Sequence, residues 1–122
     1  MLIVAATLLF ATGFAHSYLG ERYILMRLFR RDNLPQLFGG TAFTIGTLRF
    51  AWHLTTVAWW GLGYMVWMAG QQSLDAAHAL RAVAVVALIS GVFPIYFTRG
   101  RHLVWIVFFV VGGLLLAVAE KI

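Results

Sequence analysis

Residues 48–70 read LRFAWHLTTVAWWGLGYMVWMAG, and they are the most informative part of the chain about its architecture. It is long and apolar enough for a membrane-spanning helix, yet it carries Arg49 and His53 one turn apart near its start. Because lipid cannot form hydrogen bonds with such groups, we expect their face of the helix to point toward other helices or a wet cavity. At 100° per residue, this face follows one line down the helix, and six residues lie within about 40° of it: Arg49, His53, Thr56, Trp60, Gly63 and Trp67.

The composition of the whole chain agrees with a membrane protein. Hydrophobic residues make up 62% of the 122 residues and charged residues 11%, against about 45–50% and about 25% in soluble domains. A soluble domain of this size cannot bury so much apolar surface in one core. Since a span needs about 20 residues, the chain has room for four spans joined by short loops.

We therefore expect one transmembrane domain, residues 1–122, folded as an all-α four-helix bundle. The predicted spans cover about residues 2–19, 48–70, 75–97 and 102–119. The first helix is expected to continue along the interface until Pro35 and its preceding residues break it, and Thr41 is expected to cap the second long helix. Ser73 is the expected N-cap of the third helix, with Asp75 in its first turn.

A cleaved signal peptide is the alternative interpretation of the first apolar run. Gly13-Phe14-Ala15 resembles a small-x-small cleavage site. No basic residue precedes the run, so an uncleaved span is the expectation.

The distribution of basic residues predicts the orientation. The formal net charge is +5, and the charges stand at the ends of apolar runs, which is typical of topology signals and not of a nucleic-acid-binding surface. One side carries seven basic residues, and the opposite side carries Arg81 and Lys121. The seven are Arg22, Arg27, Arg30, Arg31, Arg49, Arg99 and Arg101. The positive-inside rule then puts both termini on the non-cytoplasmic side of the membrane.

This topology gathers the candidate site residues in the cytoplasmic leaflet: His16, Glu21, Arg49, His53 and His102. Glu21 lies about 140° around a regular helix from His16, so Ser17 and Glu21, one turn apart, are the better local pair. Trp60 shares the Arg49–His53 face, where it either forms the wall of a pocket or packs in the core.

Three functional interpretations of this cluster stay open. His16 and His53 could ligate a haem from two helices, or His16, His53 and His102 with Glu21 could bind zinc or copper. Alternatively, His53 could relay protons or bind an anion together with Arg49. No residue spacing is diagnostic of any of these, so haem and a divalent metal remain open as cofactors. The structural alternative is that these side chains only tie helices together or reach the headgroups.

A resemblance adds to this interpretation. The strings AHSYLGE (residues 15–21), LRFAWHLTT (48–56) and RGRHLVW (99–105) resemble those of a group of short four-span bacterial membrane proteins with no assigned activity. The resemblance implies a multi-pass protein of the bacterial inner membrane and supplies no substrate or reaction.

We expect a non-enzymatic membrane protein whose cytoplasmic-side His/Arg/Glu pocket binds or transports a small ligand or ion. The alternatives are a structural or accessory subunit of a membrane complex and a haem-binding electron-transfer subunit. The lipid bilayer is the expected partner. A transport path through four short helices would require a homo-oligomer.

Overall fold

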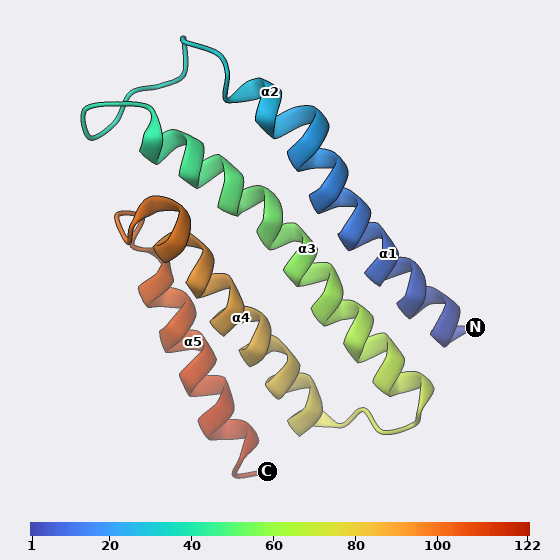
Figure 1. Ribbon diagram of the computed structural model, residues 1–122. Helices are drawn as coiled ribbons and strands as arrows, with labels where there is room; N and C mark the ends of the chain where they lie inside the picture. The colour runs from blue at the N-terminus through green and yellow to red at the C-terminus, as the bar shows by residue number, and fades with distance from the viewer.

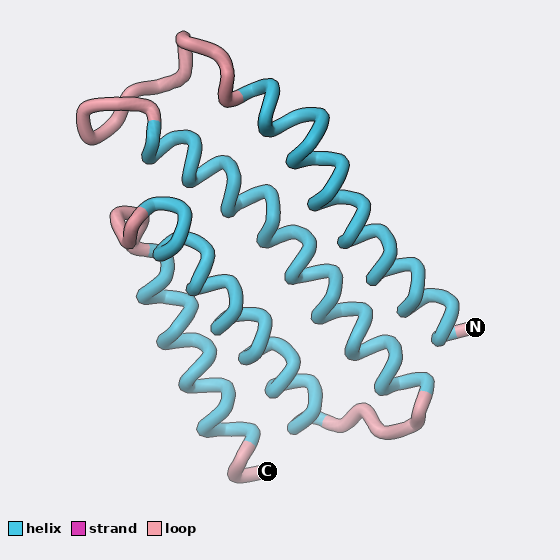
Figure 2. Tube along the Cα trace, in the orientation of Figure 1, coloured by secondary structure: helices cyan, strands magenta, loops and turns pink.

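The computed structural model describes residues 1–122, and the chain is all-helical (Figures 1 and 2). It contains no strand, only an isolated bridge between Leu37 and Gly40. The all-α prediction is therefore confirmed. The elements are α1 (Leu2–Gly20), a π-helical turn η1 (Glu21–Leu25), the short α2 (Met26–Leu28), α3 (Ala42–Gly70), α4 (Ala76–Thr98) and α5 (Val104–Ala119).

The four long helices pack as an open row in chain order. Extensive contacts join α1 to α3, α3 to α4, and α4 to α5, and α1 has no such contact with α4 or α5. Figure 1 shows α1 and α5 at opposite edges of the molecule, with both termini at the same end. The predicted number of long helices is present, but α1 and α5 do not close them into a ring. One face of α3 therefore stays uncovered between α1 and α4.

The helix boundaries differ from the predicted spans mainly at the first loop. The first helix continues beyond the predicted span end at residue 19, as expected, and α1, η1 and α2 run without a break to Leu28. The second long helix begins at Ala42, directly after the predicted cap residue Thr41, although the Thr41 side chain makes no capping hydrogen bond. The third and fourth helices begin at Ala76 and Val104, within two residues of the prediction.

The N-cap predicted for the third helix was wrong. Asp75 is the N-cap of α4, and its side chain accepts a hydrogen bond from the backbone N–H of His78 at 2.8 Å. Ser73 instead donates to the carbonyl oxygen of Met68 at 3.2 Å and closes the preceding turn. Asp75 has the stronger position because its carboxylate faces the unpaired N–H groups at the start of the helix.

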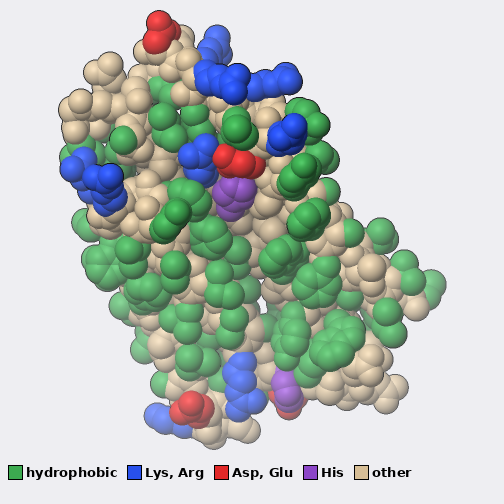
Figure 3. Space-filling model, in the orientation of Figure 1, with side chains coloured by type: hydrophobic (Ala, Val, Ile, Leu, Met, Phe, Trp, Pro, Cys, Tyr) green, Lys and Arg blue, Asp and Glu red, His purple; other side chains and the backbone are tan.

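Small residues form the contacts between helices. Only 18 of the 122 residues are buried, and the fully buried hydrophobic positions are mostly alanine. Gly112 faces Leu88 so closely that a Cβ atom at this glycine would lie 2.6 Å from the leucine side chain. The large apolar side chains point outward instead. Figure 3 shows basic side chains gathered at the two ends of the molecule and hydrophobic side chains between them.

Two of the helical segments are long and apolar enough to cross a membrane: residues Leu2–Leu28, comprising α1, η1 and α2, and α4. Helix α5 is apolar but shorter, at 16 residues. Helix α3 has sufficient length, with 29 residues, but carries the polar stripe described above.

Candidate functional site

The seam between α1 and α3 is held by polar contacts that cross from one helix to the other. The Trp52 indole N–H donates to the carbonyl oxygen of His16 at 3.1 Å, and the His16 Nε2 lies 3.2 Å from the carbonyl oxygen of Trp52. The two rings are stacked, with centroids 4.6 Å apart. Gly20 makes room for this pair, because a Cβ atom there would collide with the Trp52 indole. His16 therefore has a structural partner on α3.

A second group of polar side chains lies further along the same seam. Glu21 and Arg49 form a bidentate ion pair, with Arg49 Nη2 2.8 Å from Glu21 Oε1 and Arg49 Nε 3.2 Å from Oε2. His53 Nε2 lies 3.1 Å from the same Oε2 atom. The three side chains are partly buried, with exposed fractions of 31% for Glu21, 28% for Arg49 and 16% for His53. One carboxylate thus holds two side chains of α3.

The π-helical turn begins at Glu21. Its geometry is marked by the backbone N–H of Met26, which donates to the carbonyl oxygen of Glu21, five residues earlier. Such turns insert one residue into a helix and shift the residues beyond it around the axis. The carboxylate of Glu21 meets α3, and Arg22 and Met26 line the cavity beside it.

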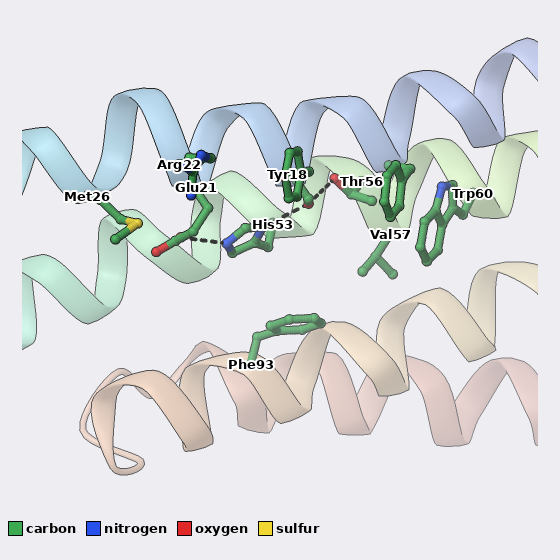
Figure 4. Close-up of a pocket in the computed structure, with 11 residues that line it drawn as sticks. Tyr18, Glu21, Arg22, Met26, His53, Thr56, Val57, Trp60 and Phe93 are labelled. Carbon is green, nitrogen blue, oxygen red and sulfur yellow. Dashed lines mark hydrogen bonds and ion pairs between the residues drawn. The ribbon is translucent and has the colours of Figure 1, made fainter.

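The network continues from His53 through two hydroxyl groups. Ser17 Oγ lies 2.8 Å from His53 Nδ1 and 2.6 Å from Thr56 Oγ1, and Thr56 donates to the carbonyl oxygen of Gly13 at 3.0 Å. Figure 4 shows the side chains of Glu21, His53 and Thr56 in line along the seam. Ser17 and Glu21, which the sequence indicated as a pair, thus bind the two ring nitrogens of one histidine.

The direction of these hydrogen bonds follows from the number of protons available. The single hydroxyl proton of Thr56 goes to the Gly13 carbonyl, so Thr56 Oγ1 accepts from Ser17. Ser17 Oγ then has no proton left for His53, and it accepts from the Nδ1–H of that ring. The other nitrogen, Nε2, faces a carboxylate and is also a donor.

A cavity of about 540 Å³ opens beside this network. It lies over the uncovered face of α3, with α1 on one side and Phe93 of α4 on the other (Figure 4). Glu21, Arg22 and His53 line one end, and Val57 lies further along α3. The complete lining is Phe14, Ser17, Tyr18, Glu21, Arg22, Met26, His53, Thr56, Val57, Trp60 and Phe93, and we call this space the α1–α4 groove.

Trp60 forms part of the groove wall and does not pack in the core. Its indole N–H donates to the carbonyl oxygen of Phe10 at 3.0 Å, which ties α3 to α1. The same ring lines the groove, and 41% of the residue is exposed. Gly13 permits this position, since a Cβ atom there would lie 2.8 Å from the Trp60 ring.

His102 lies apart from the network. Its ring stacks on Phe43, with centroids 5.8 Å apart, and meets the edge of Phe50 at 5.0 Å. Its Nδ1 faces the backbone N–H of Val104 at the start of α5. The three histidines expected to share one pocket do not do so. His53 lines the groove, His16 lines a separate cavity with Trp52, and His102 packs against aromatic rings of α3.

The residues present do not fit a metal or a haem. No group of three His, Cys, Asp or Glu side chains is close enough together to hold a metal ion. The Nε2 of His16 is bonded to the Trp52 carbonyl, and both ring nitrogens of His53 are bonded to α1. His53 therefore offers no unbonded nitrogen to a haem iron.

Two features of the groove were not visible in the sequence. Phe93 comes from α4, which no periodicity pairs with α1, and Arg22 appeared only as a topology signal.

Asp75 and His78 form a separate pair at the other end of the molecule, where the sequence indicated the start of a helix. His78 Nδ1 lies 2.8 Å from Asp75 Oδ1. Two hydrogen bonds lower the pKa of Asp75 below its ordinary value of 3.8. The larger effect comes from the backbone N–H of His78 and the smaller one from the His78 ring.

Comparison with known proteins gives no relative from which a role for these residues could be carried over. No protein-family model matches the chain, and no match is found among curated proteins or solved structures.

Proposed function

We propose that this chain is a non-enzymatic, multi-pass protein of the bacterial inner membrane and that its α1–α4 groove binds a small ligand. The distribution of apolar surface supports the membrane. Small residues fill the helix contacts while large apolar side chains point outward, which suits lipid as the solvent and small-residue packing between helices. In water the same surface would be an aggregation site.

The polar face of α3 fits this placement because α1 covers most of it. Helix α3 has 29 residues and a length of about 44 Å, more than the hydrocarbon thickness of about 30 Å. Its charged side chains, Arg49 and His53, are paired with Glu21 and lie near the end that carries most of the arginines. By the positive-inside rule this end faces the cytoplasm and both termini lie on the other side.

A single observation carries the ligand-binding part of the proposal: the groove has a charged end and an apolar remainder. Its volume of about 540 Å³ is within the range of about 300–1,000 Å³ that is usual for small-molecule sites. Its charged end is an ordered ion-pair network and the rest is lined mainly by hydrophobic side chains. A mostly apolar cavity with a few convergent polar groups is the usual form of a ligand site.

Cysteine labelling tests the topology. The chain has no cysteine, so each introduced cysteine is unique. Asn33→Cys in the first loop and Gln72→Cys in the second loop lie at opposite ends of the helices. With a membrane-impermeant thiol reagent on intact spheroplasts, we expect labelling of Gln72→Cys alone, and of Asn33→Cys only after permeabilisation. Labelling of both without permeabilisation would refute the spanning arrangement.

Native mass spectrometry of the protein released from membranes tests ligand binding. Val57→Phe fills the groove, and Val110→Phe is the matched control because Val110 points outward from α5. We expect a small molecule to stay bound to the wild type and to Val110→Phe, and to be lost from Val57→Phe. Equal retention by the two variants would contradict the groove as the binding site.

An accessory subunit of a membrane complex is the second candidate. It is favoured by the observation that Glu21, Arg49 and His53 are bonded to one another and to the α1–α3 seam. If so, a second protein would co-purify in stoichiometric amount with the chain at native abundance. It would do so with the wild type and with Val57→Phe, because this partner would not need the groove. Purification of the protein alone would count against this candidate.

A further inference from the structure

We propose that the ligand of the α1–α4 groove is a single-chain amphiphile with a carboxylate head, a long-chain fatty acid in chemical class. This inference rests on the proposed function and names its ligand. The head would lie at Arg22 beside the His53 end, and the chain would lie along α3 toward Trp60.

The charge at the head end is positive. Two guanidinium groups, those of Arg22 and Arg49, stand against one carboxylate, that of Glu21. Both Glu21 oxygens are already engaged, Oε1 by Arg49 and Oε2 by Arg49 and His53. The cluster therefore has cationic charge that no side chain of the protein neutralises, at the rim of an apolar cavity.

Arg22 is the residue with unused donors. It lines the groove and makes no ion pair. Its guanidinium carbon lies 5.9 Å from the centroid of the Tyr23 ring, at cation–π distance. A guanidinium presents a planar fork that matches a carboxylate with two parallel hydrogen bonds. Arg22 is thus placed to receive the head of an anionic ligand while Arg49 stays bound to Glu21.

The shape of the apolar part favours a chain over a compact ligand. A second cavity of about 510 Å³ adjoins the groove and shares Val57, Trp60 and Phe93 with it. It extends along α3 to Tyr64, eleven residues beyond His53, which is a distance of about 16 Å along the helix. Its other walls include Val85, Val86 and Ile89 of α4. Arg81 of α4 also lines this cavity, and its guanidinium donates a hydrogen bond to the carbonyl oxygen of Ala119. Together the two cavities form one long apolar path that leads away from the cationic end.

Fluorescence quenching by a brominated fatty acid tests the proposal. The probe is hexadecanoate brominated at its terminal carbon, added to the protein in nanodiscs of zwitterionic lipid. We expect saturable quenching of tryptophan fluorescence, most of which is lost in Trp60→Phe. The methyl ester of the same probe lacks the charge and is expected not to quench. Equal quenching by the ester would overturn the proposal.

Arginine variants test the head site. Arg22→Gln is expected to weaken binding about tenfold, because it removes hydrogen bonds to a charged group at a partly exposed site. Arg30→Gln is the matched control, since it removes one charge from the same end of the molecule but does not line the groove. Equal weakening by both variants would assign the effect to general surface charge. Tighter binding of a phosphate-headed amphiphile of the same chain length would overturn the carboxylate assignment.

The two proposals fail in different ways. If native mass spectrometry shows a molecule that Val57→Phe excludes, but the brominated acid does not quench, the groove is a ligand site and the amphiphile class is wrong. If Val57→Phe changes neither measurement, both proposals fall. In case Trp60→Phe disturbs the α1–α3 seam, Val57→Phe is the second variant that must abolish saturable quenching.

Discussion

Replacement of Glu21 by glutamine is the sharpest test of the network, because one carboxylate holds both charged side chains of α3. The change removes the ion pair with Arg49, at 2.8 and 3.2 Å, and the charged contact with His53 at 3.1 Å. It keeps the size of the side chain and one carbonyl acceptor. The effect is therefore electrostatic and not one of packing.

The expected magnitude lies between the values for exposed and buried pairs. A hydrogen bond to a charged group contributes about 1.5–3 kcal/mol, whereas an exposed ion pair contributes about 0–1 kcal/mol. With 31% of the Glu21 side chain exposed, we discount the first value and expect a loss of about 2 kcal/mol. Because α3 is the only long helix against which α1 packs extensively, the lost stability weakens the packing of α1 on α3.

Hydrogen exchange of the protein in nanodiscs measures this local effect. A loss of about 2 kcal/mol corresponds to an increase of about thirtyfold in the opening of α1, and exchange in residues 2–28 is expected to accelerate accordingly. Helix α5, which does not contact α1, is expected to exchange as in the wild type. Glu120→Gln is the matched control, since Glu120 is exposed and has no ion pair. Equal exchange of α1 in the two variants, or equal acceleration of α5, would refute the reasoning.

Three further outcomes follow from the geometry. Gly20→Ala is expected to destabilise the α1–α3 seam by about 1–3 kcal/mol in a denaturant titration, because the new methyl group collides with Trp52. Gly113→Ala is the neutral control, since a Cβ atom at Gly113 has no neighbour within 4 Å. The pKa of Asp75 is lower in the folded protein, so its contribution to stability is present above pH 3.8 and is lost as the pH falls through the folded pKa. Hydrogen exchange in the first turn of α4 is therefore expected to become faster on acidification of the wild type, but not of Asp75→Asn. Nitrogen-15 spectra are expected to show a proton on Nδ1 of His53, because Ser17 donates its own proton to Thr56, and an Nδ1 without a proton would contradict this hydrogen-bond assignment.

The polar stripe on residues 48–70 illustrates how far periodicity can lead. Its prediction that Arg49, His53 and Thr56 face another helix agrees with their contacts to α1, because side chains at helical spacing share one face in any regular helix. The pattern did not indicate which helix covers that face. It also gave no reason to expect Phe93 of α4 at the groove.

The histidines show where local reasoning failed. His16 and Ser17 are neighbours on α1, yet they point about 100° apart, so His16 stacks on Trp52 while Ser17 reaches His53. His102 lies near the same end of the molecule but on the far edge of the row. A shared depth along the helices was therefore insufficient evidence for a shared site.

Composition and local pattern were enough to predict the all-helical fold, the approximate limits of the four long helices and the polar face of α3. These properties depend on composition, helix-breaking residues and a periodicity of 3.6 residues, all of which act over short distances along the chain. The open row of helices, the contacts of Glu21 with Arg49 and His53, and the apolar groove beside them became known from the packing of the helices. These features depend on which small residues allow two helices to approach, and no local pattern encodes that choice.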